Sequence, residues 1–178
     1  MNPKVIENFV SDEDCQYFIE FFDELADKGI ITDRHTNEND GRSLVWNLDN
    51  PIFNQYAKKY FDIIADLYDG PEKLYPHIVG LYRYGIGPGL GDHIDIMNDG
   101  CSECKMSGII YFNDNYEGGE IWFPNLNFEV KPPKGSLIYY PAFGEEYRHG
   151  VRAITSGYRY AIPTCFTTDI ERSQKHYL

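Results

Sequence analysis

The feature that most constrains the fold is a change of hydrophobic period near residue 77. Beyond this point hydrophobic residues recur at every second position in short segments, and clusters of Gly, Pro, Asn and Asp separate most of them. Successive side chains of a strand point to opposite faces, so this pattern predicts strands. They lie near residues 77–84, 106–112, 119–123, 126–130, 136–140, 147–152 and 158–167. Many short strands favour a sandwich, barrel or jelly roll over a parallel α/β sheet.

The part of the chain before residue 77 has mainly helical periodicity. Ser11 is a predicted N-cap with acidic residues at 12–14 in the following turn, and Gly29 is a predicted stop. A second helix is predicted to start around Pro51, with residues 32–43 before it forming an exposed loop. We therefore expect a single domain over residues 1–178, α+β but mainly β. Its 1–75 part would be mainly helical support, and its 76–168 part a β core.

Composition and charge exclude several classes of function. The formal net charge of −12 argues against binding to a phosphate backbone or an anionic membrane, since both need cationic surface. No segment approaches the roughly 20 apolar residues of a membrane span, and the first residues do not resemble a secretory signal. We expect a cytoplasmic protein whose four cysteines are free thiols. No feature indicates the oligomeric state.

Three residues have the pattern of a metal site. His93 and Asp95 form an H-x-D pair, and an i, i+2 spacing in extended chain directs both side chains to the same side. His149 lies in another predicted strand and could complete the set. Two imidazoles and one carboxylate are the ligands of a non-haem Fe(II) centre with an open face. The competing interpretation is an accidental H-x-D and a structural histidine in the core.

Arg159 adds a possible binding function for a carboxylate. Residues 153–157 are predicted to be the loop of a hairpin joining the strands of His149 and Arg159, so both side chains would point to the same face. An inward-facing arginine is costly to bury unless it is paired. It could therefore bind a dicarboxylate whose other end chelates the metal, or form a structural salt bridge with a carboxylate of the chain.

Further motifs occur in order across residues 80–165. They are Tyr84-x-x-Gly87 before His93-Ile94-Asp95, then Ile110-Tyr111-Phe112-Asn113-Asp114, Glu117-Gly118-Gly119-Glu120-Ile121-Trp122-Phe123-Pro124 and Lys131-Pro132-Pro133-Lys134-Gly135-Ser136. They resemble the Y-x-x-G-x-x-Y-x-x-H-x-D, Y-L-N-D, E-G-G-E-T-x-F-P and K-P-x-x-G-x elements of the Fe(II)/2-oxoglutarate-dependent dioxygenases, in their prolyl 4-hydroxylase-like branch. The resemblance implies a double-stranded β-helix (jelly roll), buttressed here by the N-terminal helices.

The resemblance also implies roles for individual residues. It assigns the two histidines and the aspartate to iron, as metal ligands and catalytic residues, and Arg159 to the distal carboxylate of 2-oxoglutarate. Tyr84 and Tyr111 match tyrosines that line the 2-oxoglutarate pocket, and Tyr82 is a weaker candidate on the same strand face. The implied cofactors are Fe(II), 2-oxoglutarate and O2, with ascorbate as a further candidate.

The implied reaction is hydroxylation of an unidentified substrate with release of succinate and CO2. A small molecule or peptide, such as a prolyl residue or a free amino acid, is the expected substrate. Leu90, Ile121 and Arg159 depart from the branch, which often has tyrosine, threonine and lysine there, and this weakens the prolyl assignment more than the cofactor assignment. The alternatives are a zinc hydrolase with the same ligands, which gives Arg159 no role, and a non-catalytic jelly-roll binding module.

Two other features lie outside this pattern. Cys101 and Cys104 form a C-x-x-C pair that could bind structural zinc or act as a redox pair, but no second pair completes a zinc knuckle, so bystander thiols are the simpler interpretation. Arg42 loosely resembles a segment near the substrate channel of prolyl hydroxylases, and a solvated loop arginine is its simpler interpretation.

Overall fold

A computed structural model describes residues 2–31, 42–46, 51–95 and 103–174 of the chain. The helices and strands in chain order are β1 (Lys4–Ile6), α1 (Asp12–Asp27), β2 (Arg42–Trp46), α2 (Pro51–Asp66), β3 (Tyr75–Tyr84), β4 (Leu90–His93), β5 (Cys104–Tyr111), β6 (Glu117–Gly118), β7 (Ile121–Phe123), β8 (Phe128–Val130), β9 (Leu137–Pro141), β10 (His149–Val151), β11 (Ile154–Ser156) and β12 (Arg159–Thr167). Neither helix has the length and apolar character needed to cross a membrane.

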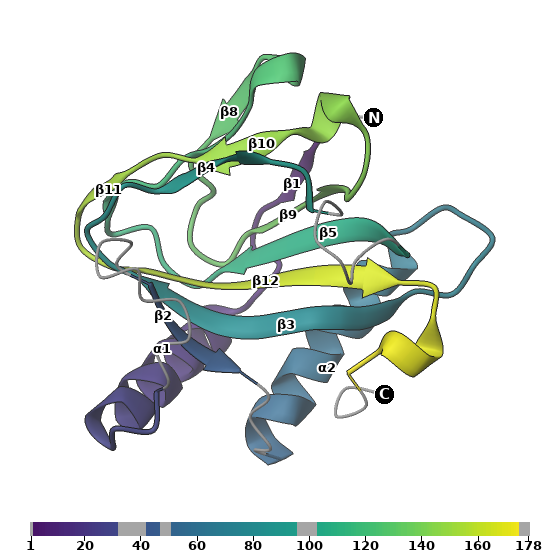
Figure 1. The fold of residues 1–178 in the computed structure, drawn as a ribbon. Coiled ribbons are helices and arrows are strands. Elements are labelled where there is room, and N and C mark those ends of the chain that lie inside the picture. Colours follow the sequence, from purple (N-terminus) through teal and green to yellow (C-terminus); the bar gives the residue numbers. More distant parts are fainter. Residues whose placement is uncertain (1, 32–41, 47–50, 96–102, 175–178) are drawn as a thin grey trace.

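The strands form two main sheets with antiparallel pairing throughout. The large sheet has six strands in the order β1-β9-β5-β12-β3-β2, and the small sheet has four in the order β4-β10-β7-β8. A two-stranded ribbon pairs β11 with β6. In Figure 1 the small sheet lies above the large one, and both helices lie below it. The mainly β class predicted from the sequence is therefore confirmed.

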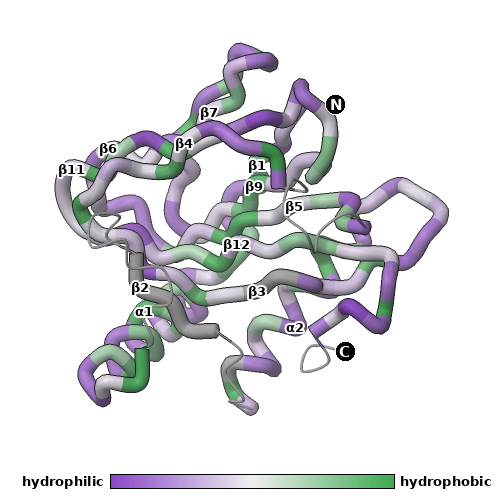
Figure 2. Tube along the Cα trace, viewed as in Figure 1, coloured by the Kyte–Doolittle hydropathy of each residue, from purple (hydrophilic) through white to green (hydrophobic). Residues whose placement is uncertain are grey.

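The two helices cover the outer face of the large sheet. Helix α1 begins as predicted, because the Ser11 hydroxyl accepts a hydrogen bond of 3.1 Å from the backbone N–H of Asp14. Its hydrophobic residues alternate with hydrophilic ones (Figure 2), and the buried side includes Phe18, whose ring stacks on Phe112 at 4.5 Å. Burial of this apolar stripe, more than helix propensity, holds α1 on the sheet.

The period-two pattern of β9 divides the molecule into two core layers. Leu137 and Tyr139 belong to the core between the large sheet and the helices. Ile138 and Tyr140 belong to a second core between the two sheets. Strand alternation thus gives β9 two buried faces, and its inner face lies toward the small sheet.

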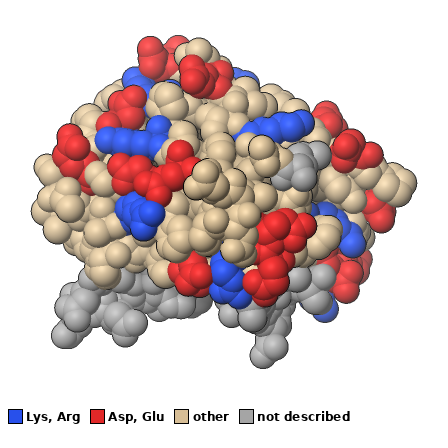
Figure 3. Space-filling model, turned by 90° about the horizontal axis from the view of Figure 1, so that it is seen from above, with Lys and Arg blue, Asp and Glu red and all other residues tan. Residues whose placement is uncertain are grey.

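Acidic and basic side chains are interspersed on the face seen from above (Figure 3). Ion pairs in the part of the chain that contributes to the small sheet include Arg152 with Glu129 at 2.6 Å and Arg148 with Glu145 at 3.1 Å. Exposed pairs of this kind contribute little to stability, so we attribute the packing of the small sheet to its inner core.

The hairpin predicted between His149 and Arg159 is wrong. Both edges of β10 are occupied within the small sheet, by β4 and by β7, whereas β12 lies in the large sheet between β3 and β5. The chain between them crosses from one sheet to the other and forms β11 on the way. Arg159 is consequently opposite Tyr84, not His149.

Four of the strands, β1, β2, β6 and β11, were not predicted, and the segment of β4 was expected to be a strand or an extended turn. β1 pairs with β9 and β2 pairs with β3, so they form the two edges of the large sheet, and β11 lies in the predicted loop. Residues 42 and 43, predicted to belong to a loop, begin β2, whereas residues 32–41 of that predicted loop lie outside the described residues. Short edge strands bury little surface and therefore leave a weak periodic signal.

Adjacent isoleucines of α2 offer a matched test of this packing. Ile64 is 1% exposed and points at β5, where its Cγ2 would lie 3.4 Å from a Cβ on Gly108, whereas Ile63 is 42% exposed. We expect Ile64→Ala to lower the free energy of unfolding by about 2–5 kcal/mol, because it leaves a cavity. Ile63→Ala should cost less than about 1 kcal/mol. Urea unfolding followed by circular dichroism measures both, and equal losses would contradict the placement of α2.

Candidate metal centre

The three predicted metal ligands meet at the edge of the small sheet. His93 ends β4 and His149 begins β10, and the antiparallel register of these strands makes the two histidines direct partners. Asp95 follows His93 by two positions and turns its carboxylate to the same side. One ligand atom of each residue lies within 4.8 Å of the others. Segments far apart in the sequence therefore form one cluster of donors.

Backbone carbonyls orient both imidazoles. Nδ1 of His93 lies 3.0 Å from the carbonyl oxygen of Gly91, and Nδ1 of His149 lies 3.0 Å from that of Tyr147. A carbonyl only accepts, so each Nδ1 carries a proton and each Nε2 is turned toward the cluster. Oδ1 of Asp95 lies 3.3 Å from Nε2 of His93 and 3.7 Å from Nε2 of His149. All three donor atoms thus point at a common position.

The charge states of the cluster suit a divalent cation. Burial alone would raise the pKa of Asp95, but hydrogen bonds from His93 and Ser107 and the nearby histidines lower it below its ordinary value. Ser107 donates to Oδ2, which leaves Oδ1 facing the histidines. Burial lowers the pKa of His149, which keeps that imidazole neutral. A hydrogen bond with Asp95 raises the pKa of His93, and a metal at the site would take the place of the proton shared there. One carboxylate and two imidazole nitrogens match the donor set of a 2-His-1-carboxylate centre.

A cavity of about 250 Å³ opens beside the ligands. Leu90, Ile109, Val151 and Pro163 give it an apolar wall, and Arg159 lies on its lining as well. The donor atoms occupy one side of this space only. A metal held there would keep coordination positions directed at the cavity.

Arg159 is a buried cation without a carboxylate partner among the described residues. It is 4% exposed, and its guanidinium lies 4.1 Å from the ring centroid of Tyr84 and 5.8 Å from that of Tyr111. Nη1 donates to the carbonyl oxygen of Gly119 at 3.2 Å, but within the described part of the chain neither Nε nor the buried hydroxyl of Tyr111 has a hydrogen-bond partner. Buried donors left unpaired are costly, so this pocket fits an anionic carboxylate. A salt bridge within the described chain does not account for Arg159.

Sequence reasoning missed Ser107, Tyr116 and Tyr140. The hydroxyl of Tyr140 lies 3.0 Å from Nε2 of His149, and that of Tyr116 is buried with no hydrogen-bond partner among the residues that the structure describes. Ser107 and Tyr140 occupy positions in predicted strands whose alternation was visible. That alternation separates the two faces of a strand without telling which face meets the metal ligands.

Tyr82, Arg42 and the cysteine pair were weaker candidates from the sequence, and the structure treats each of them differently. Tyr82 stacks on Tyr84 at 5.4 Å and lines the cavity, as expected for a weaker candidate. Arg42 belongs to β2, opposite Tyr84 in register, and only its backbone is described. Cys101 lies outside the described residues, while Cys104 is a buried free thiol. The interpretation of Cys101 and Cys104 as bystander thiols therefore stays a prediction.

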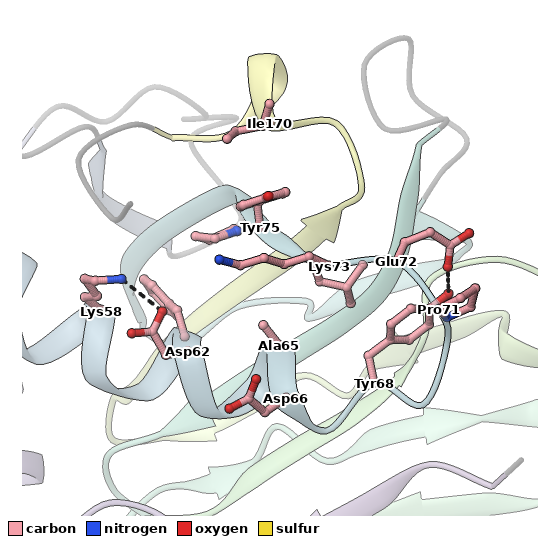
Figure 4. Close-up of a pocket in the computed structure, with 13 residues that line it drawn as sticks. Lys58, Asp62, Ala65, Asp66, Tyr68, Pro71, Glu72, Lys73, Tyr75 and Ile170 are labelled. Carbon is pink, nitrogen blue, oxygen red and sulfur yellow. Dashed lines mark hydrogen bonds and ion pairs between the residues drawn. The ribbon is translucent and has the colours of Figure 1, made fainter.

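A larger cavity, of about 820 Å³, lies elsewhere, between α2 and the start of β3 (Figure 4). None of the candidate ligands lines it. Several of its polar groups pair with one another, such as Lys58 with Asp62 at 3.0 Å and Tyr68 with Glu72 at 3.0 Å. We therefore place the chemistry in the smaller cavity beside the donors.

Comparison with known sequences points to one family. Residues 79–167 match the family model described as the 2OG-Fe(II) oxygenase superfamily. Prolyl 3-hydroxylase 2 of Rattus norvegicus is 38% identical over 68 residues, which is 35% of this chain and 10% of that protein. The chain thus spans a small part of that relative. A putative prolyl 4-hydroxylase of Acanthamoeba polyphaga mimivirus is 23% identical over 151 residues, 78% of this chain and 60% of the viral protein.

Solved structures share the fold. A Trichoplax adhaerens prolyl hydroxylase, in complex with a hypoxia inducible factor peptide fragment, has a TM-score of 0.75 at 20% identity, over 96% of this chain and 85% of that one. A viral collagen prolyl hydroxylase from Paramecium Bursaria Chlorella virus-1, in complex with 2OG, has a TM-score of 0.68 at 19% identity, over 93% and 96%. These likenesses confirm the predicted jelly-roll fold.

Removal of one donor should abolish tight metal binding. We expect metal-free protein to bind Mn(II) in anaerobic calorimetry, and His149→Ala to weaken binding by more than the about 10–100-fold typical of losing an outer-shell partner. His77→Ala is the control, because His77 lies on β3 and its Nδ1 contacts the carbonyl of Arg172. Equal affinity in the two variants would exclude His149 as a ligand.

Proposed function

Since the chain belongs to the 2OG-Fe(II) oxygenase superfamily, we propose that it is an Fe(II)- and 2-oxoglutarate-dependent dioxygenase that hydroxylates a prolyl residue of a peptide. The observation that carries the proposal is Arg159. This buried guanidinium has no carboxylate partner among the described residues and shares one cavity with three converging metal donors. A zinc hydrolase would use the same donors but would leave the arginine unexplained. A non-catalytic module would need neither the three metal donors nor the buried arginine.

Each element of the site has a task in this proposal. His93, Asp95 and His149 would hold Fe(II), and Arg159 with the phenol of Tyr111 would hold the distal carboxylate of 2-oxoglutarate. Bound together, Fe(II) and 2-oxoglutarate would supply the oxidising chemistry, with O2 as oxidant and succinate and CO2 as products. The protein's contribution is to orient both groups and to keep water from the reacting atoms.

The two histidines are unequally accessible, which indicates the side from which substrate arrives. The side chain of His93 is 34% exposed, whereas that of His149 is 4% exposed and packs against Phe123 at 5.2 Å. The His149 side of the centre is therefore closed by the inter-sheet core. Substrate would approach over β4, past His93 and Leu90.

The prolyl assignment is supported by relatives and by the cavity wall. The two relatives and the two solved structures compared above are named as prolyl hydroxylases. Apolar side chains such as Ile109 and Pro163 line the cavity, and such a wall suits an uncharged pyrrolidine ring. We also propose a reducing, cytoplasmic location, because Cys15 and Cys104 are free thiols.

Anaerobic titration with Fe(II) and 2-oxoglutarate tests the cofactor assignment. We expect a visible metal-to-ligand absorption band and, once O2 is admitted, slow formation of succinate. Proline-containing peptides should accelerate succinate release and gain the mass of one oxygen atom, which mass spectrometry detects. Tight zinc binding with no succinate would refute the dioxygenase. Succinate release that no prolyl peptide accelerates would refute the substrate assignment alone.

Replacement of Arg159 should affect the co-substrate and not the metal. Charge-assisted hydrogen bonds contribute about 1.5–3 kcal/mol, so Arg159→Ala should weaken 2-oxoglutarate binding about 10- to 150-fold. Mn(II) affinity should stay at the wild-type value. Arg172→Ala, on the remote turn Ile170–Arg172, is the control for loss of one positive charge. Calorimetry measures both ligands, and a parallel loss of metal binding would assign Arg159 a structural role.

A further inference from the structure

We propose that Tyr140 is a positioning residue of the metal centre whose hydroxyl changes its hydrogen-bond acceptor when metal binds. In the metal-free protein it donates to His149. With metal bound it donates to the carboxylate of Asp95 and fixes that ligand together with Ser107. The inference rests on the proposed metal-dependent function and adds to it a residue that selects the orientation of a ligand.

Strand geometry directs Tyr140 at the ligands. It lies on the inner face of β9 and is 1% exposed. Its ring contacts Phe123 at 4.9 Å and His149 at 4.8 Å between centroids. These contacts leave the phenol little freedom to turn away, so its hydroxyl must find its partners within the metal cluster.

The direction of the present hydrogen bond follows from the histidine. Nδ1 of His149 faces the carbonyl of Tyr147 at 3.0 Å and carries the proton. Nε2 is then an acceptor, and the Tyr140 hydroxyl, 3.0 Å away, donates to it. A metal ligated by His149 needs the same lone pair. Loading the site must therefore break this hydrogen bond, and a buried hydroxyl left unpaired would be costly.

Asp95 is the acceptor within reach. The Tyr140 hydroxyl lies 3.0 Å from Nε2 of His149, and Oδ1 of Asp95 lies 3.7 Å from the same nitrogen, so the hydroxyl and the carboxylate converge on one atom. Ser107 already donates to Oδ2 of this carboxylate. Two hydroxyl donors from different strands, β5 and β9, would hold the carboxylate in one orientation. Outer-shell hydrogen bonds of this kind orient metal ligands.

The adjacent tyrosine provides a matched control. Tyr139 is also buried, but it belongs to the core beneath the helices, on the opposite face of β9, with Nζ of Lys4 lying 5.8 Å from its ring centroid. Tyr139→Phe and Tyr140→Phe remove the same atom from neighbouring positions of one strand. Only the second removes it from the metal cluster.

The experiment measures Mn(II) affinity by calorimetry and the visible absorption of the Co(II)-loaded protein. We expect Tyr140→Phe to raise the Mn(II) dissociation constant about 10-fold or more and to alter the Co(II) bands, because an outer-shell partner of Asp95 is lost. Ser107→Ala should change both readouts in the same direction. Tyr139→Phe should leave both at the wild-type values.

Unchanged or tighter Mn(II) binding by Tyr140→Phe, with unchanged Co(II) bands, would overturn the inference. It would show that the hydroxyl only hydrogen-bonds to His149 in the metal-free protein. Circular dichroism of the metal-free variants confirms that they are folded. Failure of the wild-type protein to bind metal would instead overturn the proposed function. The two failures are therefore distinguishable.

Discussion

The antiparallel pairing of β4 with β10 is the interaction on which the candidate site depends. It makes His93 and His149 direct partners and lets Asp95, just beyond the strand, complete the donor set. The inter-sheet core then supports this pair from below, through the rings of Phe123 and Tyr140. The metal geometry is thus a property of sheet register, since a slip by one residue would turn a ligand to the opposite face.

A second constraint comes from the buried charge across the cavity. Arg159 lies against the face of Tyr84 and one carbonyl, an arrangement that stabilises a cation only in part. A dicarboxylate would complete the pairing of this cation and also reach the metal donors. Two features of one cavity would then be satisfied by the same ligand: an arginine without a carboxylate partner among the described residues, and a set of metal donors with an open side.

Local chemistry was predictable from the sequence, and pairing over long distances was not. The start of α1 at Ser11 and the H-x-D geometry depend on neighbours within a few residues, and both predictions agree with the structure. The predicted hairpin failed because periodicity does not tell which strands pair, and β10 found both partners far away in the chain. Tyr140 was missed for a related reason. A strand buried on both faces offers no polar side that would mark the one facing the metal.

The pairing of β1 with β9 has a consequence for handling the protein. Lys4–Ile6 is a short strand, yet it covers the outer edge of Leu137–Pro141, which is buried and carries Tyr140. Without this cover, β9 would present a row of free backbone N–H and C=O groups flanked by large apolar side chains, a template for pairing between chains. We therefore expect β1 to hinder self-association at this edge of the large sheet. Purification tags are better joined at a distance from that strand than directly beside it.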